Sequence, residues 1–123
     1  MTRLFVGLGA LAAALGVALG AFGAHGLEGR VSPDRLETFR TGVEYQMYHA
    51  LALLVVGWAA AQGWGPILHW AGYCFVAGIV IFSGTLSLLV LTDTGWLGAI
   101  TPLGGVVFIV GWALLAWAAV FGG

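Results

Sequence analysis

The chain has 123 residues, of which 61% are hydrophobic and 7% are charged, and its net charge is −1. A water-soluble domain carries about a quarter charged residues, so this composition cannot cover a soluble surface and indicates a membrane protein. With four basic residues against five acidic ones, the chain lacks the positive surface that nucleic-acid binding needs. A single cysteine, Cys74, excludes an intrachain disulfide and a multi-cysteine metal site within one chain.

Four apolar stretches are long enough to cross a membrane, for which a helix needs about 20 residues. These runs are continuously apolar and do not alternate, which favours helices over a barrel. The sequence therefore predicts an all-α polytopic protein, a single membrane domain over residues 1–123 with four transmembrane helices in a bundle. The expected spans are residues 4–24, 43–61, 67–91 and 102–121. The first run exceeds the usual h-region of about 7–15 residues, so we expect a retained span and not a cleaved secretory signal.

The connection between the first two spans carries its own helix signal. Ser32 followed by Pro33 is typical of a helix N-terminus, and apolar residues follow at helical spacing. Residues 33–40 are therefore expected to form a short amphipathic helix on the membrane surface, which leads into the second span through Thr41 and Gly42. The alternative is one continuous helix over residues 33–61 whose first two turns stand in water.

Small residues follow one another at intervals of three or four along the first span. Gly9, Gly16 and Gly20 belong to this row, and Gly16 with Gly20 forms a GxxxG pair. Such rows let two helix backbones approach closely. We expect helix packing at these glycines, either within one chain or, as the alternative, across the interface of a homo-oligomer.

Polar side chains gather in the half of the bundle that holds the loops after the first and third spans. The opposite half is nearly free of hydrogen-bonding groups. A pore or proton relay needs such groups through the full membrane thickness, so the pattern favours a one-sided ligand pocket or a hydrogen-bonded plug. The candidate ligand-binding residues are His25, Tyr45, Gln46, His49, Ser83, Thr85, Ser87 and Thr101.

His49 is a functional candidate because ionisable residues are rare inside membranes, but a histidine can equally bond groups across a helix interface. Glu44 lies about 140° round the helix from His49, and Arg40 one turn earlier is its natural ion-pair partner. His25 and His49 with Glu44 are ligand types that transition metals accept, yet their spacing matches no metal motif. We therefore expect no metal and no cofactor.

Several stretches resemble a known family. They are residues 20–27, residues 41–46 and 49–54, residues 82–86, and residues 100–105 followed by Gly111 and Trp112. In this order they are similar to the signature stretches of the domain-of-unknown-function family 423, also called uncharacterised protein family 0382. The resemblance implies small proteins of bacterial inner membranes, with eukaryotic relatives similar to transmembrane protein 256.

The resemblance carries over the following residues: His25, Glu44, Gln46, His49, Ser83, Thr85 and Thr101. The third stretch departs from the family pattern, because Thr85 and Ser87 stand where we would expect a serine and then a tyrosine. The resemblance therefore assigns no tyrosine hydroxyl to this stretch.

The orientation in the membrane has two opposing signals. Three arginines in the first loop favour a cytoplasmic loop by the positive-inside rule, whereas the basic C-terminal tails of similar proteins imply cytoplasmic termini.

Three functions follow from these features. The leading one is a non-enzymatic protein of the inner cell membrane that binds a lipid-like or other small amphiphile, or a membrane partner, at the one-sided pocket. The second is a homo-oligomeric permease for a small solute or ion, with its path along the glycine row. The third is an enzyme using Glu44 and His49 as acid and base, which we do not expect because no nucleophile or oxyanion motif accompanies them.

Overall fold

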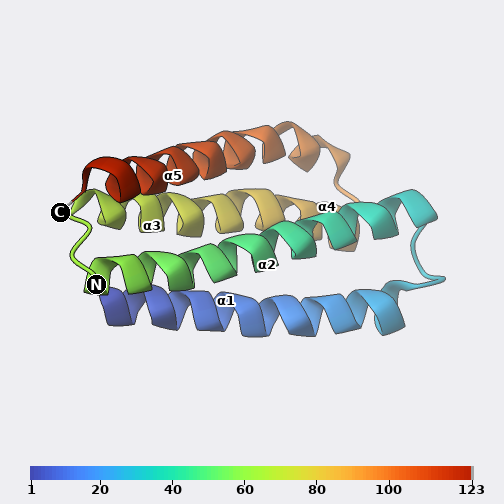
Figure 1. The fold of residues 1–123 in the computed structure, drawn as a ribbon. Helices are drawn as coiled ribbons and strands as arrows, with labels where there is room; N and C mark the ends of the chain where they lie inside the picture. The colour runs from blue at the N-terminus through green and yellow to red at the C-terminus, as the bar shows by residue number, and fades with distance from the viewer. Residues whose placement is uncertain (123) are drawn as a thin grey trace.

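The computed structural model describes residues 1–122, and the regular structure within this range is entirely helical. Figure 1 shows the helices as long rods that run side by side. The first rod is α1 (Thr2–Phe22) continued by the π-helical turn η1 (Gly23–Leu27), and the second is α2 (Pro33–Ala61). The third joins α3 (Ile67–Gly78), the π-helical segment η2 (Ile79–Ser83) and α4 (Gly84–Thr92). The fourth is the 3₁₀ turn η3 (Gly95–Ala99) followed by α5 (Thr101–Phe121).

Three of the four rods are long and apolar enough to cross a membrane. They cover Thr2–Leu27, Ile67–Thr92 and Gly95–Phe121. The second rod, α2, does not reach the same apolar content, because its first half carries the polar and charged residues around Arg40, Glu44 and Gln46. The chain is thus an all-helical protein with three candidate membrane-spanning helices.

The separate surface helix expected at residues 33–40 does not form, because α2 runs without a break from Pro33 to Ala61. Its start is as expected, since the Ser32 side chain accepts a hydrogen bond from the backbone N–H of Arg35 at 3.2 Å. The helix does not break at Gly42, where the glycine serves the packing of α2 against another helix. A Cβ placed on Gly42 would lie 3.2 Å from the Cβ of Leu86, so this glycine allows α4 to approach α2 closely. The alternative of one continuous helix describes the structure.

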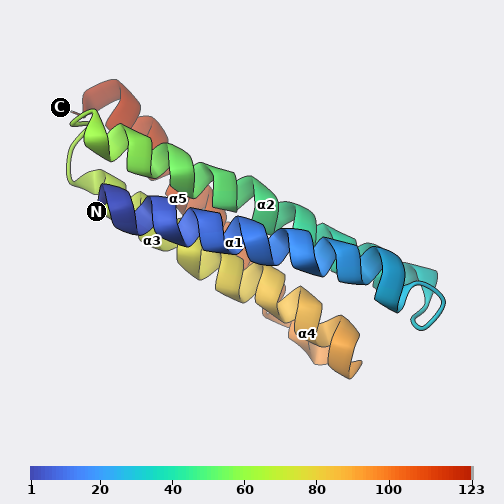
Figure 2. The same ribbon diagram turned by 90° about the horizontal axis from the view of Figure 1, so that it is seen from below.

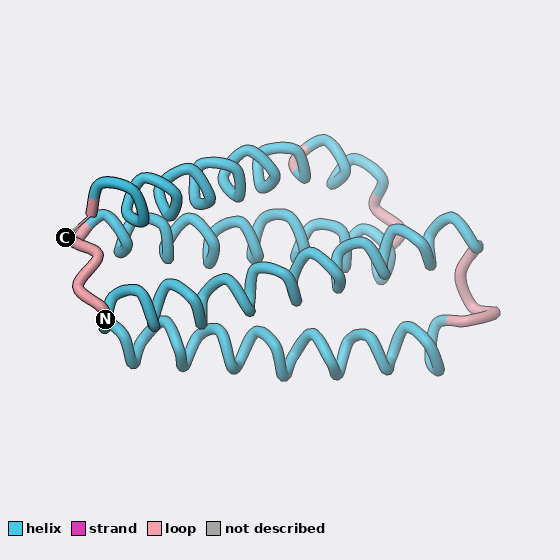
Figure 3. The backbone as a smooth tube through the Cα atoms, viewed as in Figure 1, coloured by secondary structure: helices cyan, strands magenta, loops and turns pink. Residues whose placement is uncertain are grey.

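The rods do not all contact one another to the same extent. The most extensive contacts are those of α1 with α2 and of α3 with α5, while α2 also packs on α3, η2 and α4. Figure 2, turned by 90°, shows α1 in front of the layer that α2 and α3 form. Both termini lie at the same end as the turn that joins α2 to α3, and the connections before α2 and before η3 lie at the other end (Figure 3).

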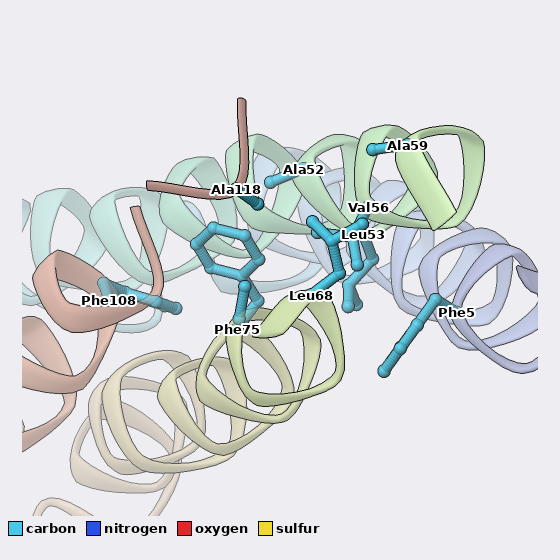
Figure 4. Close-up of a cluster of buried hydrophobic side chains, with 10 residues drawn as sticks. Phe5, Ala52, Leu53, Val56, Ala59, Leu68, Phe75, Phe108 and Ala118 are labelled. Atoms are coloured by element: carbon cyan, nitrogen blue, oxygen red, sulfur yellow. The ribbon is translucent and has the colours of Figure 1, made fainter. Parts of the chain in front are cut away.

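Aromatic and aliphatic side chains fill the half of the molecule nearest the termini. Figure 4 shows this core, in which Phe5 of α1, Val56 of α2 and Phe75 of α3 are fully buried. A second, smaller cluster around Phe39 lies toward the other end, where η1, α2 and α4 meet. Close packing within these clusters fixes the separation of the rods.

The glycine row of α1 lies against α2. A Cβ on Gly9 would lie 2.7 Å from the carbonyl oxygen of Ala50, and one on Gly20 would lie 3.6 Å from Val43. At Gly16 the added atom would meet Met47. This geometry is intramolecular helix packing of the small-residue type.

The contact at Gly9 gives a first prediction. Gly9→Leu places a side chain where the Ala50 carbonyl and Leu53 already are, so we expect overpacking to lower the free energy of unfolding by about 1–3 kcal/mol. Gly7→Leu is the matched control, because nothing lies within 4 Å of a Cβ at Gly7. Unfolding of both variants by sodium dodecyl sulfate in mixed micelles, followed by circular dichroism, checks the difference. Equal stability of the two variants would contradict the assigned α1–α2 contact.

Candidate functional site

The eight polar residues expected to line one pocket occupy four different environments. Tyr45 and His49 face a groove between α2 and α5. Gln46, Ser83 and Ser87 line another groove between α1, α2 and the third rod. The other three residues line neither of these two grooves. Thr85 and Thr101 bond to each other between α4 and α5, and His25 is exposed on η1.

His49 is held by two hydrogen bonds within the chain. Its Nε2 lies 3.0 Å from the indole nitrogen of Trp112, and its Nδ1 lies 2.7 Å from the backbone oxygen of Tyr45. An indole N–H can only donate and a carbonyl can only accept. The assignment that satisfies both is therefore a neutral imidazole with its proton on Nδ1, which donates to Tyr45 while Nε2 accepts from Trp112.

Aromatic rings enclose the same imidazole. The ring of His49 stacks on Phe108 with centroids 3.5 Å apart and an interplanar angle of 9°. Only 4% of the His49 residue surface is exposed. Because both ring nitrogens are occupied, His49 has no lone pair left for a ligand or a metal. Its contacts join α2 to α5.

Gln46 lies one turn away on α2 and bonds to a different helix. Its side-chain Nε2 donates to the backbone oxygen of Ala12 at 2.9 Å, close to the middle of α1. The amide oxygen of Gln46 makes no hydrogen bond within the described residues. The residue is 4% exposed, so this half-satisfied amide is a buried polar group between α1 and α2.

Ser83 carries a buried hydroxyl that has no hydrogen-bond partner within residues 1–122. A serine in an α-helix commonly donates to the carbonyl four residues earlier, as Thr85 does to Ile81 at 2.5 Å. At Ser83 the backbone is π-helical, and the corresponding carbonyl of Ile79 accepts the N–H of Gly84 instead. The Ser83 hydroxyl, on a residue 2% exposed, makes no bond to this carbonyl.

Gln46, Ser83 and Ser87 line a membrane-facing groove of about 380 Å³, which we call the Gln46 groove. Its walls are apolar, with Leu15 of α1 on one side and Val80 of η2 on the other, and no charged residue lines it. Gly84 also lines the groove, and a Cβ at Gly84 would meet no atom within 4 Å. The groove therefore combines an oily wall with neutral hydrogen-bonding groups.

Thr85 and Thr101 bond to each other across the start of α5. Their hydroxyl oxygens are 2.7 Å apart, and Thr85 also lies within hydrogen-bonding distance of the carbonyl oxygens of Ile81 and Phe82. Thr101 also lies 3.3 Å from the carbonyl oxygen of Leu97, so either threonine can donate to the other while its partner donates to a backbone carbonyl. This hydrogen bond links α4 to α5. Because both hydroxyls are engaged within the protein, neither is well placed to bind a ligand.

The charged residues stand apart from these groups. Arg40 and Glu44 are both exposed, and no salt bridge joins them in the described structure. The ion pair that does form links Arg35 to Asp93 at 3.3 Å, between the start of α2 and the turn after α4. Within residues 1–122 no three histidine, cysteine or acidic residues lie close enough to hold a metal ion.

Sequence reasoning missed the partners that satisfy the polar groups. Trp112 and Phe108 of α5, and the Ala12 carbonyl of α1, had no assigned role. Trp112 did carry a signal, because it lies near the middle of its span, where an indole N–H has neither water nor headgroups to bond. A tryptophan and a buried histidine in neighbouring helices are natural partners.

The fold and these buried polar contacts define a small multi-pass helical membrane protein whose hydrogen bonds join its own helices. The chain belongs to the family described as "Protein of unknown function (DUF423)", whose profile matches residues 19–105. This confirms the family resemblance drawn from the sequence.

Relatives match almost the whole chain. It is 52% identical over 120 residues to the UPF0382 membrane protein YwdK of Bacillus subtilis, covering 96% of this chain and 97% of that protein. It is 51% identical to the UPF0382 membrane protein SAB0533 of Staphylococcus aureus and 47% identical to SH2409 of Staphylococcus haemolyticus, in each case over 92% of both chains. No solved structure matches the chain.

The His49–Trp112 contact gives a second prediction. Trp112→Phe leaves the buried Nε2 of His49 without a donor, and we expect a loss of about 1–3 kcal/mol in the free energy of unfolding. Adding His49→Phe removes the unpaired acceptor, so the double variant should be more stable than Trp112→Phe alone. Unfolding in mixed micelles measures both. A double variant that is less stable than either single one would contradict the assigned pairing.

Proposed function

We propose that this protein binds a small amphiphile with a neutral, hydrogen-bonding head in the Gln46 groove, and that it does so without catalysing a reaction. The observation that carries the proposal is the buried Ser83 hydroxyl, which has no partner within the described chain. An unpaired buried polar group costs about 1–3 kcal/mol. Ser83 lines the Gln46 groove but its hydroxyl oxygen is covered, so a ligand that supplies the missing bond recovers this cost once the side chain turns into the groove.

The lining of the groove defines the chemistry of the ligand. The Gln46 amide oxygen can accept a hydrogen bond, and the hydroxyls of Ser83 and Ser87 can donate or accept. A hydroxyl or carbonyl head therefore fits, whereas a phosphate or ammonium group would lack a counter-charge in the hydrocarbon region. The apolar walls suit the tail of the same molecule.

The two other functions derived from the sequence have less support. A permeation path between subunits was placed along the glycine row of α1, but that row packs against α2 of the same chain. Acid–base catalysis needs Glu44 and His49 in one site, but Glu44 is exposed and both nitrogens of His49 are engaged. Ser83 has no base among the residues that line its groove.

The proposal includes a topology of four crossings in one inner-membrane domain, with α2 as the fourth span. Support comes from the position of α2, which lies alongside α1 and α3 over most of its length (Figures 1 and 2). The buried residues of α2 after His49, such as Leu53 and Val56, are apolar. With four crossings, both termini lie on one side of the membrane.

This topology gives a third prediction. In a Cys74→Ser background, Glu28→Cys and Gln62→Cys place single thiols just before and just after α2. A membrane-impermeant thiol reagent should label them from opposite sides, and a C-terminal tag should be accessible from the Gln62 side. Labelling of both positions from the same side would show that α2 does not cross.

The ligand proposal gives a fourth prediction. Ser83→Ala removes a hydroxyl that bonds to nothing in the chain, so we expect unfolding stability equal to or above that of the parent. Gly84→Leu fills the Gln46 groove without meeting any neighbouring atom. Both variants should fold and lose the co-purified amphiphile, which native mass spectrometry of the protein in mild detergent detects.

Gly105→Leu is the matched control, because it adds the same side chain to open space outside the Gln46 groove. It should retain the amphiphile. Equal retention in the parent, Ser83→Ala and Gly84→Leu would overturn the proposed site. Loss of stability in Ser83→Ala would instead make the hydroxyl a structural group.

A further inference from the structure

A second groove lies between α2 and α5, on the side of His49, and we call it the aromatic groove. It has an open volume of about 720 Å³. Most of its lining is aromatic and comes from both helices and from η2: Tyr45, Tyr48, His49, Phe82, Phe108 and Trp112. Neither Gln46 nor Ser83 belongs to it. The groove is therefore separate from the one assigned to the proposed function.

Several of these rings are nearly parallel. His49 lies at 9° to Phe108 and at 19° to Tyr45, and Tyr45 lies at 30° to Phe82 with centroids 4.7 Å apart. Tyr45 is 39% exposed, whereas His49 and Phe108 are buried, so Tyr45 offers the ring on which a guest can stack. A planar guest can extend the stack, because offset-stacked rings attract one another beyond the effect of burying apolar surface.

The rings are also fixed before a guest arrives. The two hydrogen bonds of His49 hold its plane, and its stacking on Phe108 holds the neighbouring ring. Phe108 is itself 3% exposed, next to Gly78 of α3, whose missing side chain makes room for the ring. A preorganised surface binds a rigid guest at a lower entropic cost than a surface that must first be ordered.

Two polar groups at the groove have no partner in the described chain. The hydroxyls of Tyr45 and Tyr48 form no hydrogen bond within residues 1–122, and their side chains lie 5.7 Å apart by ring centroid. Each can donate to a carbonyl or accept from a hydroxyl. No charged residue lines the groove, so a neutral guest is favoured over an ion.

From this geometry we infer that the aromatic groove binds a planar conjugated ring that carries neutral carbonyl or hydroxyl oxygens and an apolar tail, the chemistry of a quinone or its reduced form. The ring stacks on the aromatic lining, and its oxygens bond to Tyr45 and Tyr48. A flexible acyl chain has neither a flat face to stack nor oxygens along its length, and it loses more conformational freedom on binding.

Gly105 provides a direct test. It lines the aromatic groove, and a Cβ there would meet no atom within 4 Å, so Gly105→Leu fills the groove without disturbing the helices. Gly7→Leu is the matched control, since it adds the same side chain to open space outside both grooves, and Gly84→Leu tests the Gln46 groove. Tyr45→Phe with Tyr48→Phe removes both hydroxyls and keeps both rings.

The probe is a naphthoquinone with a short alkyl tail, titrated into the purified full-length protein in mild detergent and followed by calorimetry. We expect saturable binding to the parent and to Gly7→Leu. Gly105→Leu should weaken binding at least about tenfold, equivalent to about 1.4 kcal/mol. The double tyrosine variant should weaken it by about three- to tenfold, because two hydrogen bonds are lost while stacking remains.

Three results would overturn the inference. The first is non-saturable uptake that is equal in all variants, which is partition into the micelle. The second is loss of binding in Gly84→Leu but not in Gly105→Leu, which places the quinone in the Gln46 groove. The third is a parent protein that is dimeric and becomes monomeric on Gly105→Leu, which makes a second copy of the chain the occupant.

Discussion

Inside a hydrocarbon core there is no water to satisfy a polar group, so each one must find its partner within the protein. This constraint organises the interior of the bundle. Gln46 donates to the Ala12 carbonyl of α1, Trp112 of α5 donates to His49 of α2, and the hydroxyls of Thr85 and Thr101 join α4 to α5. Each bond connects two rods. Exceptions within the described residues include the amide oxygen of Gln46 and the fully buried hydroxyl of Ser83, and the latter supports the proposed ligand.

Glycine and phenylalanine set the spacing that makes these bonds possible. Phe5 of α1 lies against Gly72 of α3, and Phe108 of α5 lies against Gly78, so large rings fill the room that missing side chains leave. The backbones approach where a glycine meets a neighbour and separate elsewhere. Gly84 and Gly105 line the two grooves, and a Cβ at either position would meet no atom within 4 Å. Glycine thus allows close helix packing at some positions and leaves open groove space at others.

The helices follow from the sequence because long apolar runs and the signal at Ser32–Pro33 are local properties. The break expected at Gly42 was wrong. This glycine lets α4 approach α2 closely, and no local signal in the sequence reveals that contact. The polar residues were recognised, but their division between two grooves was not. Gln46 and His49 are one turn apart on α2, about 60° round the helix, and their environments depend on which helix lies on each side. Sequence spacing does not contain that information.

The most conspicuous candidate in the sequence and the most informative group in the structure are therefore different residues. His49 attracts attention because it is ionisable, yet both its nitrogens are occupied and its role is to connect two helices and orient rings. Ser83 is inconspicuous in sequence, and only the structure shows that its buried hydroxyl lies in a π-helical segment and bonds to nothing within residues 1–122. In a membrane interior, a satisfied polar group explains stability, whereas an unsatisfied one requires another explanation. Function is best sought at the groups that the fold leaves without partners.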